Sequence, residues 1–180
     1  RRDGQQNQPV LYGRAGRAGK DRPLLDVNRL STDGTAALDW WYPSEDGALL
    51  AYGVSTSGDE SSTLRVREVA TGRDLADTIP RTRACSLAWL PDGSGFYYTR
   101  YPRPGEVPAG EEPYHRSVYL HRLGDDPAAD AKVFGDGLSL SSWPNLQLSP
   151  DGRWLAIEVS EGWSRSDLYL LDRKQGDSPV

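Results

Sequence analysis

A tight turn followed by a strand-like stretch occurs three times in this 180-residue chain and limits its fold more than any other feature. The turns are centred on the pairs Asp46-Gly47, Asp92-Gly93 and Asp151-Gly152. Each pair is followed by apolar, aromatic and β-branched residues, the types that favour β-strands. Glycine tolerates the positive φ that many turns need, and the proline before two of the pairs presets φ for a turn. The chain is therefore a repeat of strand–turn–strand units.

The spacing of the turns indicates the size of the repeating unit. The intervals between the aspartates are 92 − 46 = 46 and 151 − 92 = 59 residues. A period of roughly 40–50 residues with several strands in each unit is typical of a β-propeller blade. The longer interval contains 102–113, which has four prolines and no hydrophobic period. We expect this insertion to be a surface loop.

The strands between the turns predict an all-β fold of four-stranded antiparallel meanders. We expect the outer strands of one blade at 9–27, a blade at 37–79, a second at 84–134 and an incomplete one at 143–180. Together they form one partial β-propeller domain over 1–180, about three blades of a larger propeller. Propellers close with about four to eight blades, and open end blades would expose long apolar faces. The chain is therefore expected to be an excerpt of a longer protein.

Charge and hydropathy exclude several classes of partner. The 21 basic and 26 acidic residues give a net charge of −5 and are spread along the chain in both signs. This distribution argues against nucleic acid as a partner. No stretch approaches the roughly 18–20 apolar residues of a membrane span, so no membrane partner is expected. The single cysteine, Cys85, cannot form an internal disulfide or a multi-cysteine metal site.

Two stretches nearly match the G-x-S-x-G pattern of serine hydrolases, at Gly53–Ser57 and Gly137–Ser141. Both end in serine where the strained turn needs glycine, and neither precedes a helical pattern. The two histidines, His115 and His121, flank a strand start. We expect them at the surface or at a blade edge rather than as a catalytic base. No catalytic residue is therefore expected in this chain.

Two loops imitate ligand-binding motifs. The glycine-rich run Gly13–Lys20 has the wrong spacing for a phosphate loop, and Asp21 replaces the Ser or Thr that would hold magnesium. The run Asp26–Gly34 looks like a calcium loop, but Leu30 stands where an oxygen ligand is needed. Neither a cofactor nor a metal ion is therefore expected.

The six tryptophans are the other candidates for ligand contact. At strand positions of a repeat, packing between blades is the favoured interpretation, and a ligand-stacking cage is the alternative. Trp143, just before an innermost strand, is the one expected to face the central channel. Trp154 and Ile157 are expected to be buried between neighbouring blades. The other tryptophans are Trp40, Trp41, Trp89 and Trp163.

Several segments, taken in order, resemble the propeller domain of the prolyl oligopeptidase family. The similarity extends from about residue 5 to at least residue 172 without large gaps. The segments are Gln6-Asn7-Gln8, Val10-Leu11-Tyr12, Leu25-Asp26-Val27-Asn28, 30–38, Ser44-Glu45-Asp46-Gly47, Ala51-Tyr52-Gly53, Ser57-Gly58, Ala88-Trp89, Asp92-Gly93 and Phe96-Tyr97-Tyr98.

The resemblance implies a serine peptidase in which a propeller of about seven blades covers an α/β-hydrolase domain of the same protein. It implies that the catalytic Ser, Asp and His belong to that domain, and that the enzyme cleaves short peptides after proline. The propeller then acts as a gate that admits oligopeptides and excludes folded proteins. The alternative is a stand-alone, propeller-like interaction scaffold without enzymatic activity. The expected location is the cytoplasm, or the periplasm if a signal peptide preceded residue 1.

The resemblance also implies three substrate-facing residues. Family members commonly place an aromatic side chain just before the innermost strand that begins here at Cys85. This chain has Ala84 at that position, which implies a roomier subsite. Trp143 matches a tryptophan of the family, and Pro144 stands where an apolar pocket residue is often found.

Overall fold

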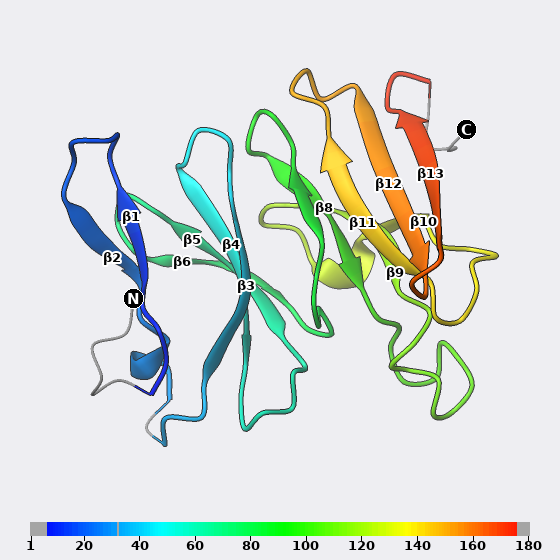
Figure 1. Ribbon diagram of the computed structural model, residues 1–180, viewed down its shortest axis with the longest axis horizontal. Helices are drawn as coiled ribbons and strands as arrows, with labels where there is room; N and C mark the ends of the chain where they lie inside the picture. Colours follow the sequence, from blue (N-terminus) through cyan, green and yellow to red (C-terminus); the bar gives the residue numbers. More distant parts are fainter. Residues whose placement is uncertain (1–6, 32, 176–180) are drawn as a thin grey trace.

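The computed structural model describes residues 7–31 and 33–175, and this part of the chain contains thirteen strands in four antiparallel sheets. The sheets follow one another across the molecule in sequence order (Figure 1). The predicted all-β class and its partial propeller are confirmed, because each sheet pairs strands that are consecutive in the sequence. Gln6, Thr32 and the expected end of the last blade at 176–180 lie outside the described residues.

The elements are as follows. The first sheet is a hairpin of β1 (Leu11–Arg14) and β2 (Asp21–Leu25). The second contains β3 (Ala37–Pro43), β4 (Leu49–Ser55), β5 (Thr63–Glu68) and β6 (Asp74–Ile79). The third contains β7 (Leu87–Trp89), β8 (Gly95–Arg100), β9 (Ser117–Arg122) and β10 (Ala131–Phe134). The fourth contains β11 (Trp143–Leu148), β12 (Trp154–Glu161) and β13 (Arg165–Asp172). Two short 3-10 helices are η1 (Val27–Arg29) and η2 (Pro127–Ala129).

The repeated turn has the same geometry at all three positions. The φ angles of Gly47, Gly93 and Gly152 are 69°, 68° and 68°, in the left-handed region that glycine adopts without strain. In each turn the aspartate accepts a hydrogen bond of 3.0 Å from the backbone N–H two residues later. A serine hydroxyl and this N–H together lower the pKa of each aspartate below its ordinary value. The predicted positive φ of these glycines is confirmed.

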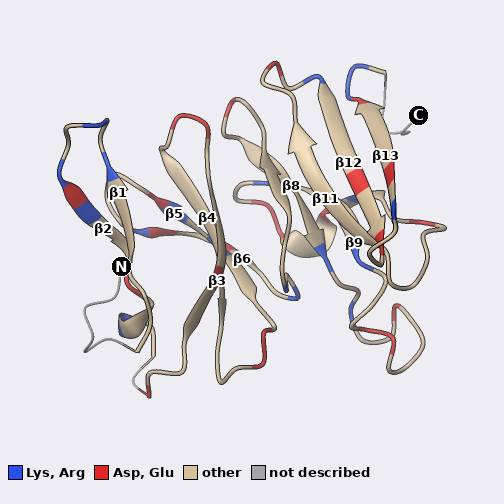
Figure 2. Cartoon of the chain, viewed as in Figure 1, with Lys and Arg blue, Asp and Glu red and all other residues tan. Residues whose placement is uncertain are grey.

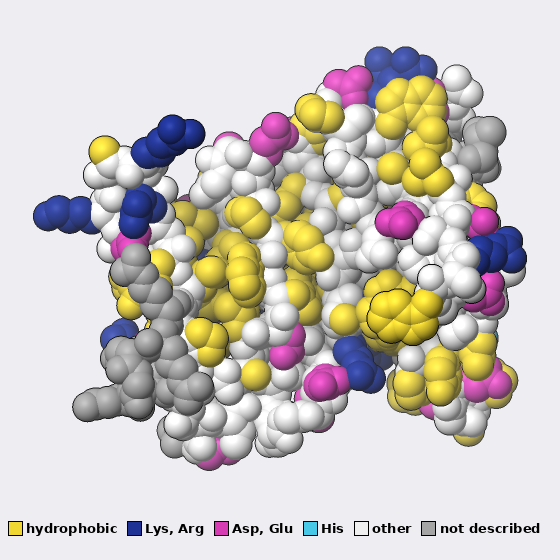
Figure 3. Space-filling view, in the orientation of Figure 1, with side chains coloured by type: hydrophobic (Ala, Val, Ile, Leu, Met, Phe, Trp, Pro, Cys, Tyr) yellow, Lys and Arg dark blue, Asp and Glu magenta, His cyan; other side chains and the backbone are white. Residues whose placement is uncertain are grey.

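The core lies between sheets, and β8 shows why. All six of its residues are buried because a sheet packs on each of its faces. Phe96 and Tyr98 face the sheet of β3–β6, whereas Tyr97 faces the sheet of β11–β13. Figure 3 shows hydrophobic side chains gathered across the middle of the molecule, over β3 and β4. Alternation along the strands therefore sorts side chains between two neighbouring interfaces.

Strand β12 corrects one sequence prediction. Ile157 is fully buried with Leu155 against the sheet of β7–β10, as expected. Trp154 was expected to be buried as well, but it is 37% exposed. The prediction was wrong because Trp154 points to the opposite face of the strand, where none of the described residues forms a further sheet.

The prediction that tryptophans pack between blades is confirmed for Trp40 and Trp89. The indole N–H of Trp40 donates to the carbonyl of Thr82 at 2.9 Å, and that of Trp89 donates to the carbonyl of Tyr42 at 3.0 Å. Both bonds join the second sheet to the third sheet or the segment leading into it. The favoured interpretation is wrong for three exposed tryptophans, Trp41, Trp154 and Trp163. Trp143, the one expected to face the central channel, is also exposed.

We expect Trp40→Phe to lower the free energy of unfolding by about 1–2 kcal/mol, because the Thr82 carbonyl loses its donor and the ring shrinks inside a packed interface. The neighbouring change Trp41→Phe is the control, since Trp41 is 49% exposed and its loss should cost less than about 0.5 kcal/mol. Hydrogen exchange of the β3 and β4 amides in the full-length protein measures both values. Equal losses from the two variants would contradict this account of the interface.

Charged residues are distributed without a dominant sign. In the view of Figure 2, basic and acidic residues are interleaved along the loops and strand ends. Opposite charges pair locally at several places, for example Arg67 with Asp74 at 2.7 Å and Arg153 with Asp172 at 2.8 Å. Within 7–31 and 33–175, no helix has the length and apolar character needed to cross a membrane.

Candidate functional site

A pocket of about 300 Å³ lies at one end of the strands of the third sheet, beside the start of the fourth sheet. The antiparallel order of the strands brings its walls together, because β7, β9 and β11 begin at this end of the molecule while β8 and β10 finish there. The lining residues come from the segments that flank these strand ends: Arg83, Tyr101, Pro113, Tyr114, Arg116, Leu140, Ser141, Ser142 and Trp143.

Arg116 links the walls of this pocket. Its side chain is buried, with only 2% of the residue exposed. Nη2 donates to the Arg83 carbonyl at 2.7 Å and to the Tyr101 hydroxyl at 3.0 Å. The guanidinium carbon lies 3.5 Å from the centre of the Trp143 ring and 4.9 Å from that of Tyr101. Both are within the range of cation–π contacts.

The rest of the guanidinium has no partner. Nε and Nη1 of Arg116 are buried and make no hydrogen bond. No acidic side chain forms an ion pair with Arg116 in the part of the chain that the structure describes. Burial lowers the pKa of Arg116, while the charge and hydroxyl of Tyr101 act in the opposite direction. A buried cation without a counter-charge is unusual, since buried charges are normally paired.

Of the three predicted substrate-facing residues, only Trp143 lines this pocket, and Ala84 and Pro144 each follow a lining residue in the sequence. Trp143 lines the pocket and is 40% exposed. Ala84 is exposed, has a positive φ of 44°, and follows the carbonyl that Arg116 holds. Pro144 is buried and is not among the lining residues, because it points to the other face of β11. Contact with a substrate stays a prediction for all three.

The sequence did not reveal the other lining residues. Arg116 stands in the ordinary run His115-Arg116-Ser117, where arginine is expected to face solvent. Its burial depends on Tyr101 and Trp143, which lie 15 and 27 positions away (116 − 101 and 143 − 116). No spacing rule predicts such contacts in an irregular loop.

His121 forms a second polar cluster, in the interior. The residue is fully buried, with Nδ1 at 2.8 Å from Asp130 and Nε2 at 3.0 Å from Asp77. Burial lowers the pKa of His121, but the hydrogen bonds and charges of the two aspartates outweigh it and raise the pKa above 6.5. The prediction that both histidines lie at the surface or a blade edge is wrong for His121. His115, half-buried beside Glu111, fits it better.

The hydrogen bonds of the His121 cluster hold two neighbouring sheets together. Asp77 belongs to β6 and also accepts from the Gly124 N–H at 2.7 Å, so the histidine joins the second and third sheets. The Tyr98 hydroxyl donates to Asp130 at 2.7 Å. Burial is the main cause of the raised pKa of Tyr98, so its hydroxyl stays protonated. Among 7–31 and 33–175, no group of three or more His, Cys, Asp or Glu residues is arranged to hold a metal ion.

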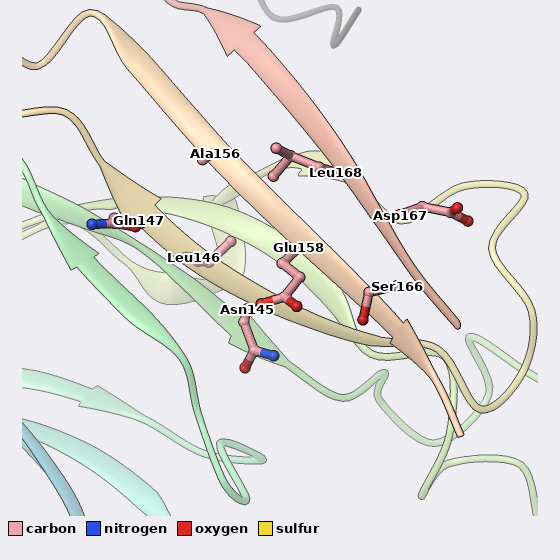
Figure 4. Close-up of a pocket in the computed structure, with 8 residues that line it drawn as sticks. All are labelled: Asn145, Leu146, Gln147, Ala156, Glu158, Ser166, Asp167 and Leu168. Carbon is pink, nitrogen blue, oxygen red and sulfur yellow. The ribbon is translucent and has the colours of Figure 1, made fainter. Parts of the chain in front are cut away.

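A third candidate, a pocket of about 330 Å³, lies on the outer face of the fourth sheet. Figure 4 shows residues from all three strands around it. Glu158 and Asn145 project near each other, and Leu168, 66% exposed, stands at the opposite side. This is an open sheet face with mixed polar and apolar side chains. The residues are Asn145, Leu146 and Gln147 of β11, Ala156 and Glu158 of β12, and Ser166, Asp167 and Leu168 of β13.

The meander sheets, their packing face to face and a pocket at the strand ends define this chain as a set of β-propeller blades. A family model described as "Prolyl oligopeptidase, N-terminal beta-propeller domain" matches residues 1–180. The chain belongs to this family, and the resemblance seen in the sequence is confirmed.

Relatives and solved structures agree with the family. The chain is 30% identical over 174 residues to the prolyl endopeptidase of Elizabethkingia meningoseptica, covering 96% of this chain and 24% of that protein. It is 32% identical over 165 residues to prolyl oligopeptidase A of Galerina marginata, covering 82% and 22%. A structure from work on two prolyl endopeptidases and their inter-domain dynamics matches with a TM-score of 0.87 and 30% identity, over 97% of this chain and 26% of that one.

The chain therefore spans about a quarter of the length of the relatives it matches. One further solved structure is prolyl oligopeptidase B from Galerina marginata bound to a 25mer macrocyclization substrate, with a TM-score of 0.77 and 25% identity over 93% of this chain and 26% of that one. These proteins provide the peptidase context of the family.

Proposed function

We propose that the chain is the gating propeller of a serine peptidase that hydrolyses short peptides on the carboxyl side of proline. The observation that carries the proposal is the match of the N-terminal propeller domain of prolyl oligopeptidases along the whole chain. The propeller supplies no catalytic group. The Ser, Asp and His of the triad belong to an α/β-hydrolase domain of the same protein, and the propeller restricts access to it.

The proposed partners are that catalytic domain and an oligopeptide substrate. A pocket lined by Tyr101, Pro113, Tyr114 and Trp143 supports peptide contact, because aromatic rings offer large apolar faces with polar edges. The related prolyl oligopeptidase B binds a 25mer, which supports a substrate of this class. We place the enzyme in the cytoplasm, a location that fractionation of the source cells tests directly.

The test of this function uses the full-length protein and one recognition sequence in two contexts. A short peptide with a single internal proline should be cleaved after that proline, and a serine-directed covalent inhibitor should abolish cleavage. The same sequence placed in a surface loop of a folded protein should resist cleavage and become sensitive once a short peptide that contains it is excised from that protein.

Two results would count against the proposal. If the full-length protein binds peptides but cleaves none, the chain is an interaction scaffold. If it cleaves the sequence equally well in the folded protein and in the short peptide, it is a peptidase without a gate, because a propeller that covers the active site should exclude folded chains.

A further inference from the structure

The pocket at Arg116 is incomplete as the chain itself builds it. The guanidinium has five N–H donors, and the three on Nε and Nη1 have no acceptor. Leaving buried donors unsatisfied is costly, and more so when the group is charged. An acceptor that carries negative charge would remove both costs at once.

Other polar groups in the pocket do not fill this role. Arg83 is itself basic, with its side chain 52% exposed and paired with Glu60 at 2.5 Å. The Tyr101 hydroxyl is already used by Nη2 of Arg116. Arg116 is thus a cation in this pocket without a counter-charge from the described residues.

The surroundings of Arg116 leave a path for a ligand. Three large side chains at the pocket are exposed, namely Tyr114 at 44%, Leu140 at 40% and Trp143 at 40%. The indole of Trp143 lies on the guanidinium face, so a ligand bound in the pocket beside this ring would lie close to the guanidinium.

We infer that Arg116 is an anion-binding residue that takes a carboxylate of a bound peptide. A carboxylate offers two oxygens with several lone pairs and forms short, charge-assisted hydrogen bonds with guanidinium N–H groups. The carboxylate has two possible sources, an acidic side chain or the C-terminus of the peptide. The inference rests on the proposed function, because it concerns how that enzyme selects its peptides.

The test measures binding of short peptides without proline to the full-length protein by calorimetry, so that no cleavage is needed. One peptide has a central Glu and an amidated C-terminus, a second has Gln in its place and a free C-terminal carboxylate, and a third has Gln and an amidated end. We expect one of the carboxylate peptides to bind about tenfold or more tightly than the third. Whichever binds tighter identifies the source of the carboxylate.

The variants separate Arg116 from the general charge of the pocket. Arg116→Gln should abolish the preference for a carboxylate. Arg83→Gln, a matched loss of one positive charge at the same pocket, should retain it. A preference that survives in Arg116→Gln, or carboxylate and uncharged peptides that bind equally to the wild-type protein, would overturn the inference.

The wild-type comparison keeps the test decisive if Arg116→Gln does not fold. A preference in the wild-type protein should then weaken in Arg116→Lys, which keeps the charge but loses the planar set of donors. An unchanged preference in Arg116→Lys would again overturn the inference. Cleavage without carboxylate preference leaves the proposed function standing, and carboxylate binding without cleavage leaves the anion site standing, so the two failures are distinguishable.

Discussion

Replacement of His121 by phenylalanine is expected to lower the free energy of unfolding of the propeller by about 3–5 kcal/mol. Phenylalanine fills most of the volume of the imidazole but makes neither of its hydrogen bonds. Asp77 and Asp130, whose side chains are 2% and 3% exposed, would then lose the imidazole that pairs with both of them. Removing one member of a buried ionic group is costly because the remaining charges stay away from water.

The same cluster predicts a dependence on pH. The pKa of His121 is raised in the folded protein above its unfolded value of about 6.5. Its stabilising contribution is therefore fully present below pH 6.5 and is lost as the pH rises through the folded-state pKa. The wild-type protein should lose stability over this range, and His121→Phe should lose this part of the dependence.

Hydrogen exchange of β6 and β9 amides in the full-length protein, repeated at several pH values, measures both effects. His115→Phe is the control, because His115 is half-buried and pairs with the partly exposed Glu111. That variant should cost less than about 1 kcal/mol. A similar loss in both variants, or a wild-type stability that does not change above pH 6.5, would show that the buried cluster carries no net charge interaction.

The fold was predictable because its signals are local. The Asp-Gly turns recur at intervals of 46 and 59 residues, close to the length of one blade, and the glycine φ angles follow from the residue type. The buried polar groups were not predictable, because each depends on a partner from another sheet or loop. His121 and Asp77 are 44 residues apart, and Arg116 and the Arg83 carbonyl are 33 apart.

Trp154 shows a second reason why burial could not be predicted from the sequence alone. A strand that is apolar on both faces favours burial on both, but it does not show whether a sheet covers each face. In this structure one face of β12 packs on the preceding sheet, and the face with Trp154 stays open. The candidate site was located only in part for a similar reason. Trp143 was found from a family pattern, whereas the arginine beneath it has no such pattern.

The repeated units differ at the position two residues after the turn glycine. This difference predicts the second large effect of a mutation on stability. Two residues after the turn glycine, the second and fourth sheets have Leu49 and Trp154, whereas the third has Gly95. A Cβ added at Gly95 would lie 2.2 Å from the carbonyl oxygen of His121 and 3.1 Å from the Cα of Arg122. Both are backbone atoms of the paired strand β9, so no side-chain rotation relieves the overlap.

We therefore expect Gly95→Ala to lower the free energy of unfolding by about 3 kcal/mol, the upper end of the usual cost of overpacking, because β8 and β9 must separate locally. Gly93→Ala is a control from the same turn. Gly93 has φ of 68° and open space around it, so that variant reports backbone strain alone, about 1–2 kcal/mol. Hydrogen exchange of the β8 and β9 amides should show the larger loss in Gly95→Ala, with faster exchange near His121. A cost no greater than that of Gly93→Ala would mean that the two strands tolerate a wider spacing, and that the close approach at Gly95 is not required by the blade.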